Sequence, residues 1–207
     1  MKPSFVVIAM AGLLMATGTA SAQSLSFGAT LTSDYISRGV SQTGHDPAFQ
    51  PWIEYESNGW YAGLWASNVA FAPDNVEIDL YGGYRWAMNA TSLDVGYARY
   101  FYDSTGDASG ELYLLVEQGL GETAAINGGI YLGHSGGLTI NDAHIGFSAS
   151  LMPNLTASTT FGVTPGSMYY GLVGLSYAVN DNFSLEAEIH DATAQSTRLV
   201  VSTDLSF

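Results

Sequence analysis

The chain has no cysteine and a single lysine, Lys2, among its 207 residues. Without cysteine there are no disulfides, so packing and hydrogen bonding must hold the fold together. Five Lys and Arg residues stand against 19 Asp and Glu residues, a formal net charge of −14. Nucleic acid is excluded as a partner, because phosphate binding needs clustered lysine and arginine. An acid surplus of this size instead favours an interior or surface that attracts cations.

Long apolar runs are also scarce. Phe5 to Met15 is apolar but falls short of the ~20 residues that a membrane-spanning helix needs. Lys2 precedes this run and Ala20-Ser21-Ala22 follows it, so residues 1–22 have the parts of a secretory signal peptide, with cleavage expected after Ala22. The mature domain, residues 23–207, then has four arginines, 19 acids and a net charge of −15. No later run is long enough for a spanning helix.

What the mature chain does contain is alternation of apolar and polar residues, which is typical of β-strands, with no convincing helical period. Turn residues separate the alternating stretches. We count twelve such segments, at 25–37, 47–57, 59–70, 75–87, 91–102, 111–120, 123–134, 142–151, 155–163, 168–179, 182–191 and 197–207.

The connections between these segments alternate in length. Asn58-Gly59 is a two-residue hairpin turn of the strongest type. The other even-numbered segments also end in brief turns, whereas odd-numbered segments mostly run into longer loops, such as 38–46, 103–110 and 135–141. Short turns at one end and longer loops at the other are typical of outer-membrane barrels. The fold class expected is therefore an all-β, transmembrane, antiparallel up-and-down barrel of about 12 strands.

The apolar faces support a membrane setting. With these faces outward, aliphatic side chains form a middle band and aromatic side chains gather at both ends, as a bilayer selects. The aromatic residues at the short-turn end are Phe27, Tyr55, Trp60, Tyr84, Trp86, Tyr177, Phe183 and Phe207, and those at the loop end are Tyr35, Phe49, Phe101, Phe161 and Tyr169. The alternative is a secreted soluble sandwich with these faces inward. Arg99 is the exception, a charge on the lipid face that is expected to reach the interface or lipopolysaccharide phosphates.

The last segment ends on an aromatic residue. Its alternate residues, Leu199, Val201, Thr203, Leu205 and Phe207, form one mainly apolar edge. This ending resembles the C-terminal signal of bacterial outer-membrane barrels, which implies the barrel assembly machinery as a partner. A terminal strand needs a pairing partner, and the first segment, antiparallel to it across a closing seam, is the one expected.

Two blocks near the start also carry a family resemblance. Ser33-Asp34-Tyr35-Ile36-Ser37-Arg38-Gly39 is followed by Gly59-Trp60-Tyr61-Ala62-Gly63-Leu64-Trp65-Ala66-Ser67-Asn68-Val69. Together they resemble the N-terminal half of the TorF-type porin family of proteobacteria, which was formerly described as conserved and of unknown function. The resemblance implies an outer-membrane barrel of porin type and supplies neither catalytic residues nor a known substrate.

If the apolar faces meet lipid, the polar faces line a lumen. Ten acidic side chains and two arginines then point into the lumen, and this excess of negative charge favours the passage of cations. The expected lining residues are Glu54, Glu56, Glu77, Asp79, Arg85, Asp94, Glu111, Glu117, Glu186, Glu188, Arg198 and Asp204. Twelve strands lie between filled eight-stranded barrels and wide porins, so an open pore and a plugged interior both fit. At the mouth, Asp34 and Arg38 are expected either to pair and fold the loop over the opening or to be solvated.

Enzymatic alternatives are weaker. Gly133-His134-Ser135-Gly136-Gly137 matches the G-x-S-x-G motif, but a nucleophile elbow needs a strand–turn–helix context that is absent here. The four histidines, His45, His134, His144 and His190, lack metal-ligand spacing. The sequence thus predicts no catalytic residues, no metal and no cofactor. It predicts an outer-membrane porin for small hydrophilic solutes with an acidic lumen, surrounded by outer-membrane lipid and lipopolysaccharide. A closed structural or adhesive barrel and a lipid-modifying barrel enzyme are the alternatives.

Overall fold

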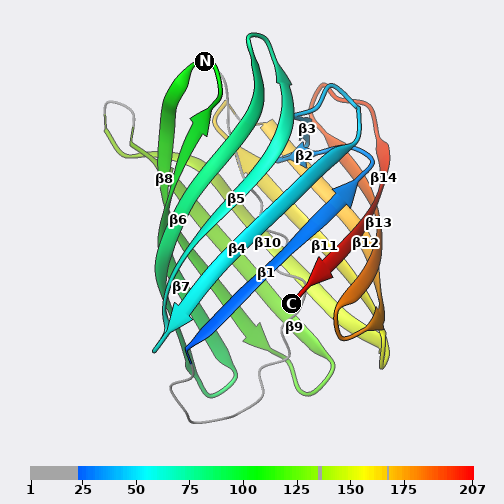
Figure 1. Ribbon diagram of the computed structural model, residues 1–207. Coiled ribbons are helices and arrows are strands. Elements are labelled where there is room, and N and C mark those ends of the chain that lie inside the picture. The colour runs from blue at the N-terminus through cyan, green and yellow to red at the C-terminus, as the bar shows by residue number, and fades with distance from the viewer. Residues whose placement is uncertain (1–22, 135–136, 167) are drawn as a thin grey trace.

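Twelve antiparallel strands form a closed barrel (Figure 1). The computed structural model describes residues 23–134, 137–166 and 168–207, so the expected signal peptide (1–22) and Ser135 lie outside the described residues. The barrel strands are β1 (Ser24–Thr32), β4 (Ala48–Ser57), β5 (Trp60–Phe71), β6 (Asp74–Met88), β7 (Thr91–Tyr102), β8 (Gly106–Gly119), β9 (Ala124–Gly133), β10 (Thr139–Met152), β11 (Leu155–Thr164), β12 (Met168–Asn180), β13 (Phe183–Ala192) and β14 (Arg198–Ser206). Across the described ranges, no helix is long and apolar enough to cross a membrane.

The expected all-β barrel of 12 strands is confirmed, and most strand ends agree with the sequence to within a few residues. The main differences lie at the loop end. The first segment, expected over 25–37, leaves the barrel after Thr32, and β8 begins at Gly106 rather than at 111. Residues 106–110 lack apolar alternation but pair with the upper part of β7, as in Phe101↔Asp107 and Tyr102↔Gly106. Backbone hydrogen bonds extend the ladder there without needing apolar side chains.

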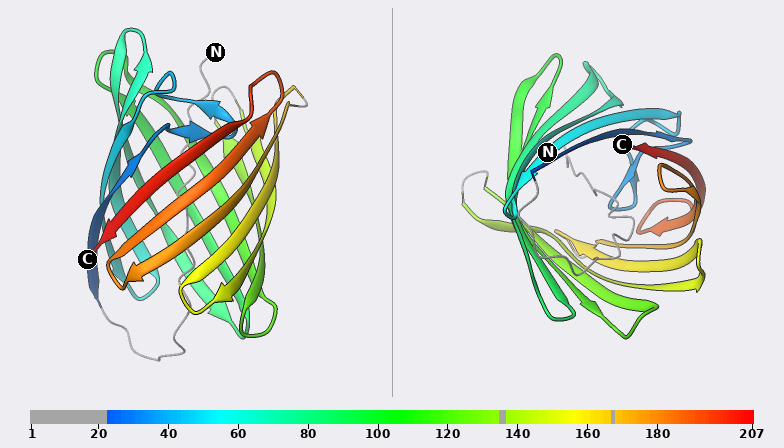
Figure 2. Two further views of the ribbon diagram at one scale, coloured as in Figure 1. Left: turned by 90° about the vertical axis from the view of Figure 1, so that its right-hand side faces the viewer. Right: turned by 60° about the horizontal axis from the view of Figure 1, so that its bottom comes forward.

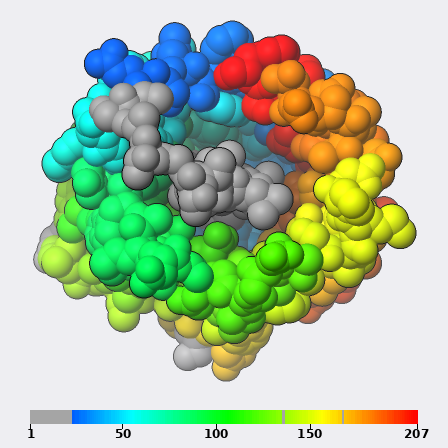
Figure 3. All heavy atoms as spheres, turned by 90° about the horizontal axis from the view of Figure 1, so that it is seen from below, coloured from blue at the N-terminus to red at the C-terminus, as the bar shows by residue number. Residues whose placement is uncertain are grey.

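The closing seam joins the first strand to the last, as expected. β1 runs antiparallel to β14 with Ala29 opposite Leu205 and Leu31 opposite Thr203. At the short-turn end, the backbone N–H of Phe27 donates to the carbonyl of Phe207 (3.0 Å), and that of Phe207 donates to the carbonyl of Phe27 (2.9 Å). Their rings stack at 5.7 Å. In the view from that end, the first and last strands lie side by side in the wall (Figure 3).

The outer face is apolar and exposed, and the inner face is polar and more buried. Along β14 and at Phe207 just after it, Leu199, Val201, Leu205 and Phe207 are each about half exposed or more, whereas Val200 is buried. Aromatic pairs mark both ends of the outer face, with Trp60 against Tyr84 at the short-turn end and Phe161 against Tyr169 at the loop end. An exposed apolar belt this wide would aggregate in water and is suited to lipid.

Between β1 and β4, the chain folds inward rather than outward. Two short strands, β2 (Ile36–Ser37) and β3 (Val40–Ser41), form a separate hairpin inside the ring of barrel strands (Figure 2). Tyr35, which alternation placed on the lipid face, is 5% exposed and packs with Trp65, Val69 and Tyr102 inside the barrel. That expectation was wrong because the strand ends at Thr32, so its alternation does not extend to Tyr35. We call residues 33–47 the inner hairpin.

Candidate functional site

The tip of the inner hairpin is a two-residue turn that touches the barrel wall at β12 and β13. Arg38 and Gly39 both have positive φ, 47° and 80°, between the paired residues Ser37 and Val40. Positive φ at both central residues defines a type I′ turn, in which glycine is favoured. A Cβ on Gly39 would lie 2.3 Å from the Cβ of Ala192 and 2.9 Å from that of Tyr170. The hairpin therefore spans the interior and abuts β12 and β13.

Arg38 anchors this hairpin to the wall. Its Nη1 and Nη2 donate to Oε1 and Oε2 of Glu111 at 3.2 and 3.1 Å, and its Nε lies 3.7 Å from Oδ1 of Asp142. The guanidinium also lies 4.7 Å from the centroid of the Tyr131 ring. A buried bidentate arginine–carboxylate pair is strong and directional. The hairpin is thus tied to β8 and β10, far along the chain.

Asp34 and Arg38 do not form the pair expected from their spacing. Asp34 accepts hydrogen bonds from the hydroxyls of Ser41 (2.6 Å) and Thr43 (3.1 Å), and its Oδ2 lies 3.0 Å from Nδ1 of His45. Arg38 is 5% exposed, so the solvated alternative is wrong as well. The turn at Arg38 directs its side chain across the lumen, while Asp34 secures the base of the hairpin.

A second arginine network lies nearer the short-turn end. Arg85 makes ion pairs with Glu54 (2.6 Å), Glu56 (3.0 Å) and Asp94 (3.1 Å). Its guanidinium lies 3.7 Å from the centroid of the Tyr61 ring. Four of the expected lining residues therefore meet in one cluster, and a single positive charge offsets part of three negative ones.

Between the two networks, buried tyrosines fill this side of the barrel. They are Tyr61, Tyr81, Tyr100, Tyr113 and Tyr131, packed with Ala98. Tyr113 lies over Gly96 of the next strand, where a Cβ would meet its ring at 2.3 Å. The hydroxyls of Tyr61 and Tyr113 are 2.6 Å apart, and Tyr61 also donates to Asp94. The β5–β9 side of the interior is consequently a packed, hydrogen-bonded core.

The opposite wall, made by β11–β14 and β1, carries small inward residues. Hydroxyl side chains line it, all of them half-buried: Ser26, Thr30, Thr156, Ser158, Thr160, Ser176, Ser184 and Ser202. Its acids are Glu186, Glu188 and Asp204, also half-buried. Glu188 contacts His190 (2.8 Å) and Asp204 accepts from the Thr30 hydroxyl. No arginine forms an ion pair with these three acids in the part of the chain that the structure describes. We call this surface the hydroxyl wall.

The remaining expected lining residues are scattered. Glu77 and Asp79 are buried near the inner hairpin, Glu117 is exposed at the short-turn end, and Arg198 lies opposite His190 at the loop end. Among the described residues, no group of three or more His, Asp or Glu side chains is arranged to hold a metal ion.

Sequence reasoning missed Asp142, which contacts Arg38 and also accepts from the Tyr170 hydroxyl at 2.8 Å. The segment expected over 142–151 begins at Asp142, and this carboxylate is not among the residues expected to line the lumen. A bulge between Ile140 and Asp142 shifts the register and turns the carboxylate inward. The inner hairpin did leave a signal, because Arg38-Gly39 between two short β-prone pairs is compatible with a two-residue turn.

The lipid-facing Arg99 has protein partners. It pairs with Asp107 at 2.5 Å and donates to the Tyr97 hydroxyl at 3.3 Å, and that hydroxyl lies 2.6 Å from Nε2 of His134. These contacts offset the cost of a charge on the outer face. Nearby in the loops, Asp103 accepts from the backbone N–H groups of Asn75 and Val76, which lowers the pKa of its carboxyl group.

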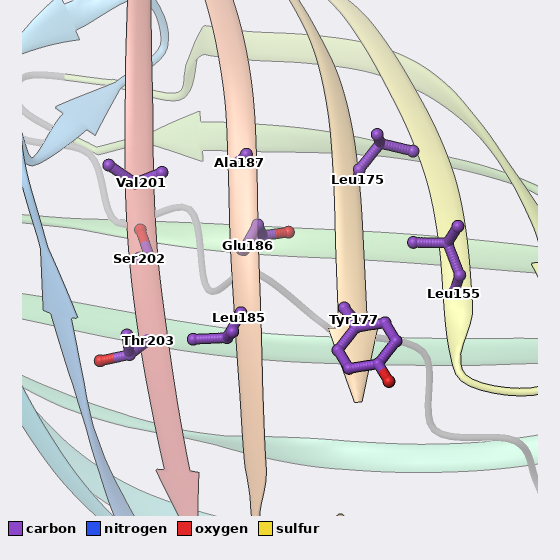
Figure 4. A pocket seen from close by; sticks show the side chains of 9 residues that line it. All are labelled: Leu155, Leu175, Tyr177, Leu185, Glu186, Ala187, Val201, Ser202 and Thr203. Atoms are coloured by element: carbon purple, nitrogen blue, oxygen red, sulfur yellow. The ribbon is translucent and has the colours of Figure 1, made fainter. Parts of the chain in front are cut away.

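The outer face also has an apolar groove over β11–β14 (Figure 4). Leu155, Leu175, Tyr177, Leu185 and Val201 surround the smaller Ala187. The groove follows from this difference in side-chain size and faces away from the lumen.

Comparison with solved structures finds the same fold in outer-membrane proteins. The KdgM porin superposes with a TM-score of 0.67 at 13% identity, covering 88% of this chain and 99% of that one. The NanC porin superposes with a TM-score of 0.59 at 10% identity, covering 89% of this chain and 99% of that one. Outer membrane phospholipase A from Escherichia coli superposes with a TM-score of 0.51 at 12% identity, covering 87% of this chain and 89% of that one. Identities this low establish the fold alone.

At the level of sequence, no curated protein matches this chain. A protein family does match, over residues 16–125, which is more than half of the 207 residues. The chain therefore belongs to the family described as bacterial protein of unknown function (Gcw_chp).

Proposed function

We propose that this protein is an outer-membrane porin that passes small hydrophilic solutes by passive diffusion and favours cations. The porin fold supports the general class, and the resemblance of its first two motifs to the TorF-type porins agrees with it. The proposal includes export by a signal peptide cleaved after Ala22, insertion by the barrel assembly machinery, and an outer surface in contact with lipid and lipopolysaccharide.

The observation that carries the proposal is the contrast between the two sides of the interior. On the β4–β10 side, Arg38 and Arg85 pair with acids and tyrosines fill the space. On the hydroxyl wall, Glu186, Glu188 and Asp204 are half-buried, and no arginine of the described residues pairs with them. A hydrophilic path along this wall would present hydroxyl groups and net negative charge to a passing solute.

The charge of that path decides which solutes it favours. Carboxylates concentrate cations and repel anions, and a narrow lumen lies within the Debye length of ~8 Å at physiological ionic strength. A solved structure of the KdgM porin is a complex with disordered oligogalacturonate, which is a polyanion. The hydroxyl wall disfavours such a solute. We therefore propose cations and small neutral hydrophilic molecules instead.

Planar bilayer recording tests this function. Purified protein should give stepwise conductance, and a KCl gradient should give a reversal potential of cation-selective sign. Combined Glu186→Gln, Glu188→Gln and Asp204→Asn should move that potential toward zero. The control, Glu117→Gln, removes an exposed acid at the short-turn end and should leave it unchanged. Absence of conductance from protein that still shows heat-modifiable migration, the gel shift of a folded barrel on boiling, would reject the porin.

A closed structural or adhesive barrel is the second candidate, and the packed tyrosines and the anchored inner hairpin favour it. The same recordings separate the two candidates. A closed barrel predicts no conductance in the native protein, with small steps appearing only after the hairpin anchor is removed.

We propose no enzymatic activity. The one motif that suggested lipid hydrolysis contains Ser135, outside the described residues, and His134, whose Nε2 lies 2.6 Å from the Tyr97 hydroxyl. The fold of outer membrane phospholipase A is similar, so the alternative has a direct test. Phospholipid hydrolysis by the purified protein that disappears in Ser135→Ala would overturn this part of the proposal.

A further inference from the structure

Two buried carboxylates beneath the inner hairpin are short of hydrogen-bond donors. Glu77 and Asp79 are two residues apart on the inner face of β6, and their exposed fractions are 0% and 1%. The Tyr102 hydroxyl donates to Oε1 of Glu77 at 2.9 Å. Oε2 of Glu77 and both carboxylate oxygens of Asp79 receive no hydrogen bond. Three buried acceptor atoms thus lie close together without a donor.

Apart from the hydroxyls of Tyr35 and Tyr102, which hydrogen-bond Glu77, the nearby donors are directed to other acids. The Arg38 guanidinium forms its bidentate pair with Glu111, and the Tyr100 hydroxyl donates to Oε2 of that same Glu111 at 2.8 Å. Arg85 is held by Glu54, Glu56 and Asp94. The ion pairs of the described residues therefore leave the two negative charges of Glu77 and Asp79 without a positive partner.

A third oxygen source comes from the inner hairpin. Oε1 of Gln42 is also buried without a donor, and this residue is 1% exposed. Its backbone N–H donates to the carbonyl of Tyr35 at 2.6 Å. The Tyr35 ring lies 5.4 Å from Trp65, and Trp65 pairs with Asp79 in the β5–β6 ladder. The amide oxygen thus belongs to the segment that covers the two acids.

Burying an unpaired carboxylate costs several kcal/mol, so the pair needs a counter-charge or protons. Calcium is a hard cation that takes six to eight oxygen ligands from carboxylates, amide oxygens and water. We propose that Glu77 and Asp79 bind a divalent cation of the Ca²⁺ class, with Oε1 of Gln42 and water completing the oxygen set. The two negative charges match one such ion, and the ion links the hairpin to β6. This site goes beyond conduction and does not depend on it.

Terbium luminescence tests the site directly. Tb³⁺ replaces Ca²⁺ at oxygen sites and emits when a nearby tyrosine is excited, a role that Tyr35 and Tyr102 fill. In protein purified from membranes of cells expressing the full chain, tyrosine-sensitised emission should saturate and be displaced by Ca²⁺. Asp79→Asn and Glu77→Gln should each weaken Tb³⁺ binding at least tenfold. Glu117→Gln, which removes an exposed acid at the short-turn end, should bind as the native protein does.

The opposite results overturn the proposal: no sensitised emission from folded protein, unchanged binding in Asp79→Asn, or an equal loss in Glu117→Gln. Heat-modifiable migration supplies a second readout and shows whether each variant folds. The folded form of the native protein should survive to a higher temperature in Ca²⁺ than in EDTA, and Asp79→Asn should lose that difference. If lowering the pH stabilises the native protein and Ca²⁺ does not, the carboxylates hold protons and the site is rejected. Neither readout needs conductance, so failure of the porin proposal would be seen separately.

Discussion

The guanidinium of Arg38 meets the carboxylate of Glu111 from the other side of the barrel interior, through hydrogen bonds of 3.1 and 3.2 Å. The two residues are 73 positions apart in the chain. Because Arg38 occupies the tip of the inner hairpin, this pair ties that tip to β8 across the lumen.

Arg38→Ala should release the hairpin. The substitution leaves Glu111 buried without its cation, which costs about 3–5 kcal/mol for a buried pair. We expect faster proteolysis within residues 33–47 and larger single-channel conductance. Asp34→Asn, which keeps most of the hydrogen bonds at the hairpin base, is the control and should change conductance little. Unchanged conductance and protease resistance in Arg38→Ala would show that the anchor has no such role.

Gly39→Ala should unseat the same hairpin without removing a charge. The new Cβ would lie 2.3 Å from that of Ala192 and would also require positive φ at a residue with a side chain. Gly166→Ala is a matched control, because its φ is +83° but nothing lies within 4 Å of the added Cβ. Limited proteolysis of both variants separates the clash from the backbone strain. Equal protease resistance would mean that contact of the hairpin tip with Ala192 and Tyr170 is unimportant.

Arg85→Gln should make the lumen more selective for cations. It frees the charges of Glu54, Glu56 and Asp94, which the guanidinium now offsets. Reversal potentials in a KCl gradient should move further in the cation-selective direction, and the folded form should be lost at a lower temperature. Arg99→Gln removes the outward-facing arginine paired with Asp107 and should not alter selectivity. A shift of the same size in both variants would contradict a local effect in the lumen.

Deleting Phe207 should impair assembly more than conduction. The deletion removes both backbone hydrogen bonds to Phe27 and the stacking of the two rings. Phe207→Ala retains the backbone bonds and should give an intermediate yield of folded barrel in the membrane. The protein that does insert should conduct as the native protein does. A normal membrane yield for the deletion would rule out a role for this residue in assembly.

The barrel itself could be predicted because its signals are local. The alternation of apolar and polar residues and the turn residues are patterns that span only a few neighbouring positions. The turn at Asn58-Gly59, where both φ angles are positive, is an example. The seam followed from the need of a terminal strand for a partner, and β1 is that partner.

The arrangement of charges inside the barrel could not be predicted in the same way. Arg38 and Glu111 lie far apart in the chain, and their contact depends on the closed ring and on the inward direction of the hairpin. Asp142 was missed because it lies at the first position of an expected segment, beside a bulge that leaves no mark on composition. The ten expected lumen acids also differ in environment, since only those near Arg38 or Arg85 are offset by an arginine.

The pairing of β1 with β14 also sets an order of events. The ring cannot close until β14 has been synthesised, because β14 supplies the second neighbour of β1. Closure is thus a step that follows synthesis of β14, the last of the twelve barrel strands that begin with β1. Until that step, β1 and β14 each present an unpaired edge, and such edges associate readily with other strands. A chain of this design would depend on being kept apart from its own copies during its passage to the membrane.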